Sequence, residues 1–88
     1  MSYENNEKQI KKFLTDIKVN LNKIDNINFL RSIFKDYGDF YIILEIVYEN
    51  LEVVYEDSIS KNEEINNKIF ALIKKHNIEI YKLMQNRL

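Results

Sequence analysis

The sequence contains no cysteine and no proline, and it has only one histidine and one glycine among 88 residues. The lack of cysteine excludes disulfides, thiolate zinc sites and cysteine nucleophiles, and a single histidine excludes a multi-histidine metal centre. With Gly38 as its only glycine, the chain also lacks glycine-rich phosphate-binding loops and tight primed hairpin turns. Much metal and covalent chemistry is thereby excluded, so we expect no cofactor, no metal and no enzymatic activity.

Long apolar runs are also missing. The longest uninterrupted runs, such as Phe40 to Leu44, have five residues, whereas a membrane-spanning helix needs about 20 apolar residues. The first ten residues carry charges and asparagines where a signal peptide needs an apolar region. We therefore expect a cytoplasmic protein without membrane insertion.

Length and composition predict one small domain that spans residues 1–88. A chain of 10.7 kDa buries roughly 64% of its unfolded surface, which is enough for one modest core. Ile, Asn, Lys, Tyr and Phe account for 48 of the 88 residues. Because all five have AT-rich codons, this bias indicates the AT-rich genome of a microbe or its phage.

Apolar residues recur every three or four positions over residues 3–24, which predicts an amphipathic helix there. If that helix continued, its apolar side would move to the opposite face, so the chain must break. Asp25 and Asn26 lie at this point, and both are good N-caps. A second helix is therefore expected over residues 26–37, closed by Gly38.

Residues 39–57 are ambiguous. They are rich in β-branched and aromatic residues that favour strands, and a hairpin turning at Glu49 and Asn50 is the alternative. The glutamates favour a helix, because their spacings of 4, 3 and 4 place them within about 60° on a helix but on both faces of a strand. These glutamates are Glu45, Glu49, Glu52 and Glu56. We therefore predict a third helix over residues 39–57.

Ser60 and Glu63 form a Ser-x-x-Glu pattern typical of a capping box. The apolar face that follows predicts a fourth helix over residues 60–87. Four helices with short connections predict an all-α fold, a small antiparallel four-helix bundle. In size and helix count this expected bundle resembles bacteriocin immunity proteins, which would imply a neutralising role; the resemblance is one of architecture only.

Charge falls into three blocks that the net charge of −1 conceals. Residues 1–35 hold seven basic and four acidic groups, residues 36–57 hold seven acidic and no basic groups, and residues 58–88 hold six basic and three acidic groups. The acidic block coincides with the predicted third helix, which is apolar on more than one side. Such a helix is either central in its bundle or shared with another chain.

We therefore predict that the protein acts by binding protein through its third helix, either as a homo-oligomer or with a foreign, basic partner. The expected contact residues are Tyr41, Ile42, Glu45, Ile46, Tyr48, Glu49, Glu52, Val53, Tyr55 and Glu56. Changing Ile46 to Lys is expected to dissociate the assembly without loss of helix.

The alternative function is a dimeric regulator that binds nucleic acid. Candidate basic residues for phosphate contacts lie near the two ends of the chain: Lys8, Lys11, Lys12, Lys74, Lys75, Lys82 and Arg87. The residues that would read the bases follow a turn at 58–60: Ser60, Lys61, Asn62, Asn66, Asn67 and Lys68. The negative net charge makes nucleic-acid binding the weaker hypothesis. His76 lies on an apolar face, where we expect a hydrogen bond to a neighbour.

Overall fold

A computed structural model shows two helices and a three-stranded sheet. It describes the backbone of residues 3–37, 42–78 and 81–87, and the side chains of residues 7–36, 42–78 and 83. The elements in chain order are α1 (Tyr3–Leu21), β1 (Ile27–Tyr37), β2 (Ile42–Asn50), α2 (Tyr55–Lys75) and β3 (Tyr81–Arg87). The predicted all-α helical bundle is therefore wrong, and the resemblance to immunity proteins in helix count is lost with it.

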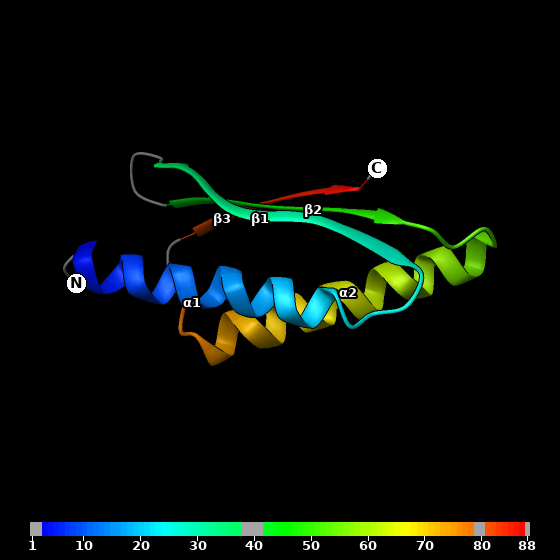
Figure 1. The fold of residues 1–88 in the computed structure, drawn as a ribbon, viewed down its shortest axis with the longest axis horizontal. Coiled ribbons are helices and arrows are strands. Elements are labelled where there is room, and N and C mark those ends of the chain that lie inside the picture. Colours follow the sequence, from blue (N-terminus) through cyan, green and yellow to red (C-terminus); the bar gives the residue numbers. More distant parts are fainter. Residues whose placement is uncertain (1–2, 38–41, 79–80, 88) are drawn as a thin grey trace.

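The sheet has the order β1-β2-β3, so β2 is the central strand and β1 is an edge strand. β1 pairs antiparallel with β2, whereas β3 pairs parallel with β2. A parallel pair needs a crossover connection, and α2 provides it. Both helices lie on the same face of the sheet (Figure 1).

The helix predicted over residues 3–24 is confirmed as α1, although it ends at Leu21. Its buried side chains recur at helical spacing and enter the core beneath the sheet; they are Ile10, Phe13, Ile17 and Leu21. A stripe of this kind stabilises the helix mainly through tertiary packing, since isolated helices of this length are marginal.

The predicted helix over residues 26–37 is wrong, because these residues form β1. Two β-bulges interrupt its pairing with β2, one between Phe29 and Arg31 and one between Phe34 and Asp36. A bulge inserts one extra residue and shifts the alternation of side chains. The inward positions of β1 are thus spaced by two and by three, a pattern that imitates the period of a helix.

The predicted helix over residues 39–57 is also wrong. Residues 42–50 form β2, residues 51–54 form a turn, and α2 begins at Tyr55; residues 39–41 lie outside the described part of the chain. The alternative hairpin turn at Glu49 and Asn50 is wrong as well, because both residues belong to β2.

Five consecutive residues of β2, from Leu44 to Tyr48, are buried. Leu44, Ile46 and Tyr48 belong to the core on the helix side, so Glu45 and Val47 face the opposite side of the sheet. A strand buried on both faces has a nearly continuous apolar sequence. This explains why the segment looked like a helix that is apolar on several sides, and Ile46 belongs to the core of the monomer.

The predicted helix over residues 60–87 is partly right. α2 begins five residues earlier, at Tyr55, with no side-chain cap at Val54, so the expected capping box does not start the helix. It ends at Lys75, because Asn77 adopts a positive φ of 52°. The amide of Ile78 donates to the carbonyl of Ile73 at 3.1 Å, which is the closing bond of a Schellman motif. Residues 81–87, which were also predicted to be helical, form β3 instead, paired with β2.

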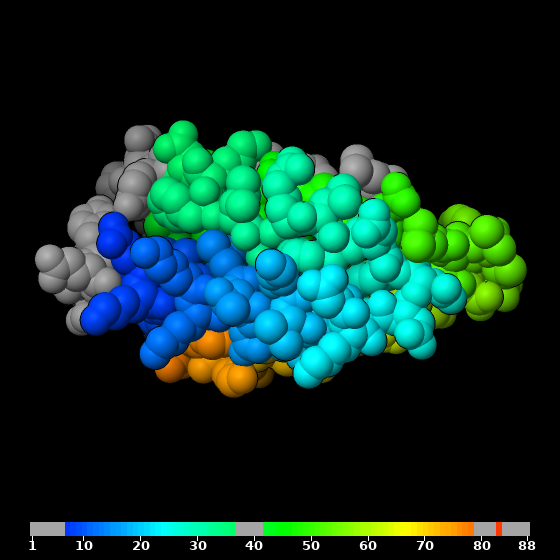
Figure 2. All heavy atoms as spheres, in the orientation of Figure 1, coloured from blue at the N-terminus to red at the C-terminus, as the bar shows by residue number. Residues whose placement is uncertain are grey.

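The molecule is elongated, with extents of 45 × 22 × 18 Å. The buried residues of α2 all lie in its second half, from Ile65 to Ile73. Its first half therefore projects beyond α1 and the end of the sheet, as Figures 1 and 2 show at the right-hand end. This projection presents the largest concentration of exposed apolar side chains among the described residues.

Candidate docking surfaces

The turn after β2 and the first turns of α2 carry five exposed apolar residues within nine positions. We call this surface the tip; it consists of Leu51, Val53, Val54, Tyr55 and Ile59. Val53 is 97% exposed and Tyr55 is 78% exposed. Single exposed apolar residues are common on protein surfaces, whereas a contiguous group of them is typical of an interaction site.

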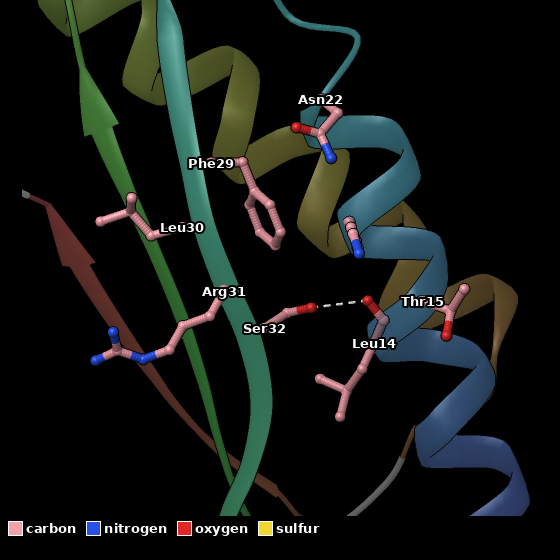
Figure 3. Close-up of a pocket in the computed structure, with 8 residues that line it drawn as sticks. Leu14, Thr15, Asn22, Phe29, Leu30, Arg31 and Ser32 are labelled. Carbon is pink, nitrogen blue, oxygen red and sulfur yellow. Dashed lines mark hydrogen bonds between the residues drawn. The ribbon is translucent and has the colours of Figure 1, made fainter.

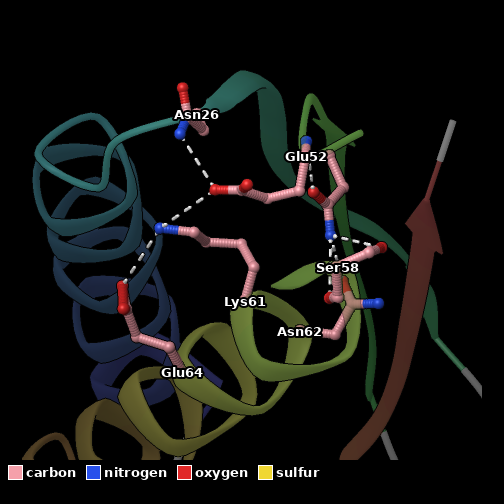
Figure 4. A network of polar contacts seen from close by, with 7 residues as sticks. Asn26, Glu52, Ser58, Lys61, Asn62 and Glu64 are labelled. Carbon is pink, nitrogen blue, oxygen red and sulfur yellow. Dashed lines mark hydrogen bonds and ion pairs between the residues drawn. The ribbon is translucent and has the colours of Figure 1, made fainter. Parts of the chain in front are cut away.

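Polar contacts anchor the base of the tip. The amide of Leu51 donates to the carbonyl of Asn26 at 2.9 Å, and the side chain of Asn26 donates to Glu52 at 2.9 Å. Lys61 lies between Glu52 and Glu64 in the same network (Figure 4). The exposed residues of the tip are therefore held on a fixed base formed by the β1, β2 and α2 ends.

A second group of contacts ties α2 to the end of β2. The side chain of Asn50 donates to the carbonyl of Ser58 and to the amide oxygen of Asn62, both at 3.1 Å. The hydroxyl of Tyr48 bonds to the same oxygen of Asn62 at 3.1 Å. Lys61 and Asn62, two residues of the candidate nucleic-acid reading end, are thus engaged within the protein.

The border of the tip is acidic. Glu56 and Asp57 are exposed in the first turn of α2, where negative charge also favours the helix dipole. They belong to the segment 36–57, which contains seven acids and no base. The tip therefore combines apolar side chains with negative charge, and a complementary surface would be apolar and basic.

A groove of about 440 Å³ lies between α1 and the edge strand β1. Leu14, Lys18 and Phe29 line it together with Thr15, Asn22, Leu30, Arg31 and Ser32. Figure 3 shows Phe29 and Ser32 directed toward α1, whereas Leu30 and Arg31 point across the other side of the strand. The hydroxyl of Ser32 donates to the carbonyl of Leu14 at 2.7 Å and joins the two walls.

Glu45 is the one buried charged residue among the described side chains, and it lies on the sheet face opposite the helices. Its carboxylate accepts hydrogen bonds from Arg31 at 3.2 Å and Lys35 at 3.3 Å. Burial raises the pKa of Glu45, but the hydrogen bonds and charges of these two cations outweigh it and hold the pKa below the ordinary value. This group of one acid and two bases links β1 to β2.

Asp16, Lys75 and His76 form a second ionic group, between α1 and the end of α2. Asp16 contacts His76 Nε2 at 2.9 Å and Lys75 Nζ at 3.0 Å. The hydrogen bond with His76, followed by that with Lys75, lowers the pKa of Asp16. The ring of Phe13 meets the imidazole edge to face at 6.0 Å between centroids, so the expectation of a hydrogen-bonded histidine is confirmed.

The structure divides the predicted contact residues into three groups. Val53 and Tyr55 are exposed on the tip and Glu56 is exposed at its border, with Glu52 half-buried at its base. Glu49 and Ile42 are half-buried on β2, whereas Glu45, Ile46 and Tyr48 are buried, and Tyr41 lies outside the described residues. Only the members from Glu52 onward therefore form one accessible surface.

Sequence reasoning missed the groove entirely. Leu14 and Phe29 are 15 positions apart and meet only because β1 is a strand that packs beside α1. The bulge next to Phe29 is the local feature that conceals this strand. No sequence signal short of recognising the bulge identifies the groove.

The described residues contain no group of three or more potential metal ligands, and neither described helix is long and apolar enough to cross a membrane. Comparison with known proteins found no matching family model, no matching curated protein and no matching solved structure. The functional argument therefore rests on the tip and the groove.

Proposed function

We propose that this protein is a non-enzymatic interaction module that docks on another protein chain through its tip. The observation that carries the proposal is the exposure of Val53 and Tyr55 on a firmly anchored turn. Tyr is favoured at interfaces because its ring is apolar and its hydroxyl is polar. The ionic group around His76 supports the non-enzymatic part, because its contacts join α1 to α2.

The energetics favour a partner that also carries positive charge. Burying Val53 and Tyr55 contributes about 3–6 kcal/mol in total, whereas association costs at least about 4 kcal/mol in lost freedom. The apolar residues alone are thus insufficient for micromolar binding. Contacts between the acidic border, Glu56 and Asp57, and a basic partner surface supply both additional affinity and orientation.

Photo-crosslinking in cells that produce the protein tests this proposal. We would replace Tyr55 with p-benzoylphenylalanine and compare it with the same replacement at Phe70, an exposed aromatic residue on α2 outside the tip. We expect discrete protein adducts from position 55 and none of comparable yield from position 70. Equal yields at both positions, or no adduct at position 55, would contradict the proposal.

The proposal keeps the cytoplasmic location expected from the sequence, which cell fractionation tests. It also separates protein binding from the alternative of a nucleic-acid-binding regulator. Salt-sensitive, sub-micromolar binding to duplex DNA would favour that regulator instead.

A further inference from the structure

The groove lies beside one edge of the sheet, where no other described strand pairs with β1. β1 is one of the two edge strands in the order β1-β2-β3, and the groove follows it at residues 29–32. An edge strand beside a helix accepts an extended segment as an additional strand, which is a recurring mode of peptide recognition. The groove follows four residues of β1, so the segment that it accepts would be about four residues long. The bulge between Phe29 and Arg31 falls within this stretch and leaves Arg31 and Ser32 as its regularly paired part.

The charge on the helix wall of the groove is positive. Lys18 lines the groove. Lys11, seven residues earlier, lies two helical turns away on the same side of α1. Asp16 is the only acid between residues 11 and 22, and it is engaged with Lys75 and His76. With Leu14 and Phe29 as its apolar lining, the groove is an apolar and basic surface.

The tip has the complementary properties. Residues 51–54 form a four-residue connection outside any helix or strand, and the backbone of Val54 is extended, with φ −91° and ψ 129°. Val53 and Tyr55 supply apolar side chains, and Glu56 and Asp57 supply negative charge directly after them. The length, backbone conformation, apolar character and charge of the tip thus match those of the groove.

We propose that the occupant of the groove is the tip of a second copy of this chain, so that copies associate head to tail. This inference rests on the proposed function, because it identifies the partner surface on which the tip docks. The tip and the groove are different patches, so the contact is heterologous. In a dimer formed in this way, one copy still has a free groove and the other still has a free tip. Assembly therefore continues past the dimer as concentration rises.

Two surface substitutions separate the halves of the contact. Val53→Lys places a cation on the tip, opposite the basic wall, and Lys18→Glu places an acid in the groove, opposite the acidic border of the tip. Two control variants lie at exposed positions of α2 outside both patches. Phe70→Lys also replaces an apolar residue by a cation, and Lys68→Glu also replaces a cation by an acid. Circular dichroism of each variant checks that the fold is retained.

Analytical ultracentrifugation of wild type from about 1 μM to about 1 mM should show species that grow beyond a dimer. Val53→Lys and Lys18→Glu should each raise the dissociation constant at least tenfold, whereas the two control variants stay within twofold of wild type. An equimolar mixture of Val53→Lys and Lys18→Glu should form a 1:1 complex of twice the 10.7 kDa chain mass, because one intact tip and one intact groove remain.

A mixture that stays monomeric overturns the inference, as does a wild type whose growth stops at the dimer, which indicates a symmetric tip-to-tip contact. If wild type is monomeric throughout but position 55 crosslinks to a different protein, the inference fails and the proposed function stands. If position 55 gives no adduct at all, the proposed function itself fails.

Discussion

Substituting lysine at Ile46 and at Val53 should give opposite results, because the two positions differ fully in exposure. Ile46 is 0% exposed at the centre of the sheet, and Val53 is 97% exposed on the tip. Both are β-branched apolar residues within eight positions of one another. The pair therefore tests whether residues 42–50 form the central strand of the monomer.

The cost at Ile46 is set by two effects. Burial of an ammonium lowers its pKa by up to about 3–5 units, and each unit corresponds to 1.36 kcal/mol, so the charge costs about 4–7 kcal/mol. The lost burial of the isoleucine side chain adds about 1.5–3 kcal/mol. A chain of this length has a free energy of unfolding of only about 4–13 kcal/mol, so we expect Ile46→Lys to be unfolded or nearly so.

Val53→Lys should change the free energy of unfolding by no more than about 0.5 kcal/mol, as exposed substitutions usually do. Urea denaturation followed by circular dichroism at low protein concentration measures both variants without a contribution from association. An Ile46→Lys variant with the wild-type midpoint would refute the buried central strand. It would also restore the hypothesis that Ile46 lies at an interface between chains.

Substitutions at three further positions test particular contacts. Glu45→Gln should lower the urea midpoint at pH 7. Burial raises the pKa of Glu45, but the cations beside it lower it further, to below its ordinary 4.5. The stability that the carboxylate contributes is therefore fully present above pH 4.5 and is lost as pH falls through the lowered pKa, so the difference between Glu45→Gln and wild type should shrink in acid. Asp16→Asn should behave in the same way below pH 3.8, because the hydrogen bond to His76 above all lowers the pKa of Asp16 from that value. A destabilisation that does not shrink at all as pH falls from 7 through the acid range would contradict an ionic role for either acid. Asn77→Ala should cost about 1–2 kcal/mol and Asn77→Gly little, since φ at this position is positive. A thermal scan that ranks Ala above Gly would show that this helix end is not left-handed.

The pattern of local periodicity was sufficient for α1 and for the second half of α2. In both, buried residues recur at spacings of three and four on one face, which is the pattern of a helix that packs one side against the core. A hydrogen bond of His76 was also expected from its place among apolar residues. In the structure this bond joins His76, at the end of α2, to Asp16 of α1.

The same reasoning failed where tertiary contacts overrode local pattern. The glutamate spacing from Glu45 to Glu56 looked helical, yet β-branched and aromatic residues placed between two other strands gain more as a strand buried on both faces. The bulge after Phe29 gave β1 a helix-like spacing. α2 ends because Asn77 adopts a left-handed backbone conformation, which the periodicity of the sequence does not reveal.

Composition and charge by themselves determined what kind of surface the protein offers: an acidic, apolar segment between two basic ones, with little material for metal or nucleotide chemistry. Only the tertiary structure decided which part of that segment is accessible. Strand pairing buries Leu44 to Tyr48, and the projection of α2 exposes Val53 to Tyr55. The reason is that burial depends on long-range packing, which joins α1, β1 and β2 across distant positions of the chain and has no counterpart in local sequence.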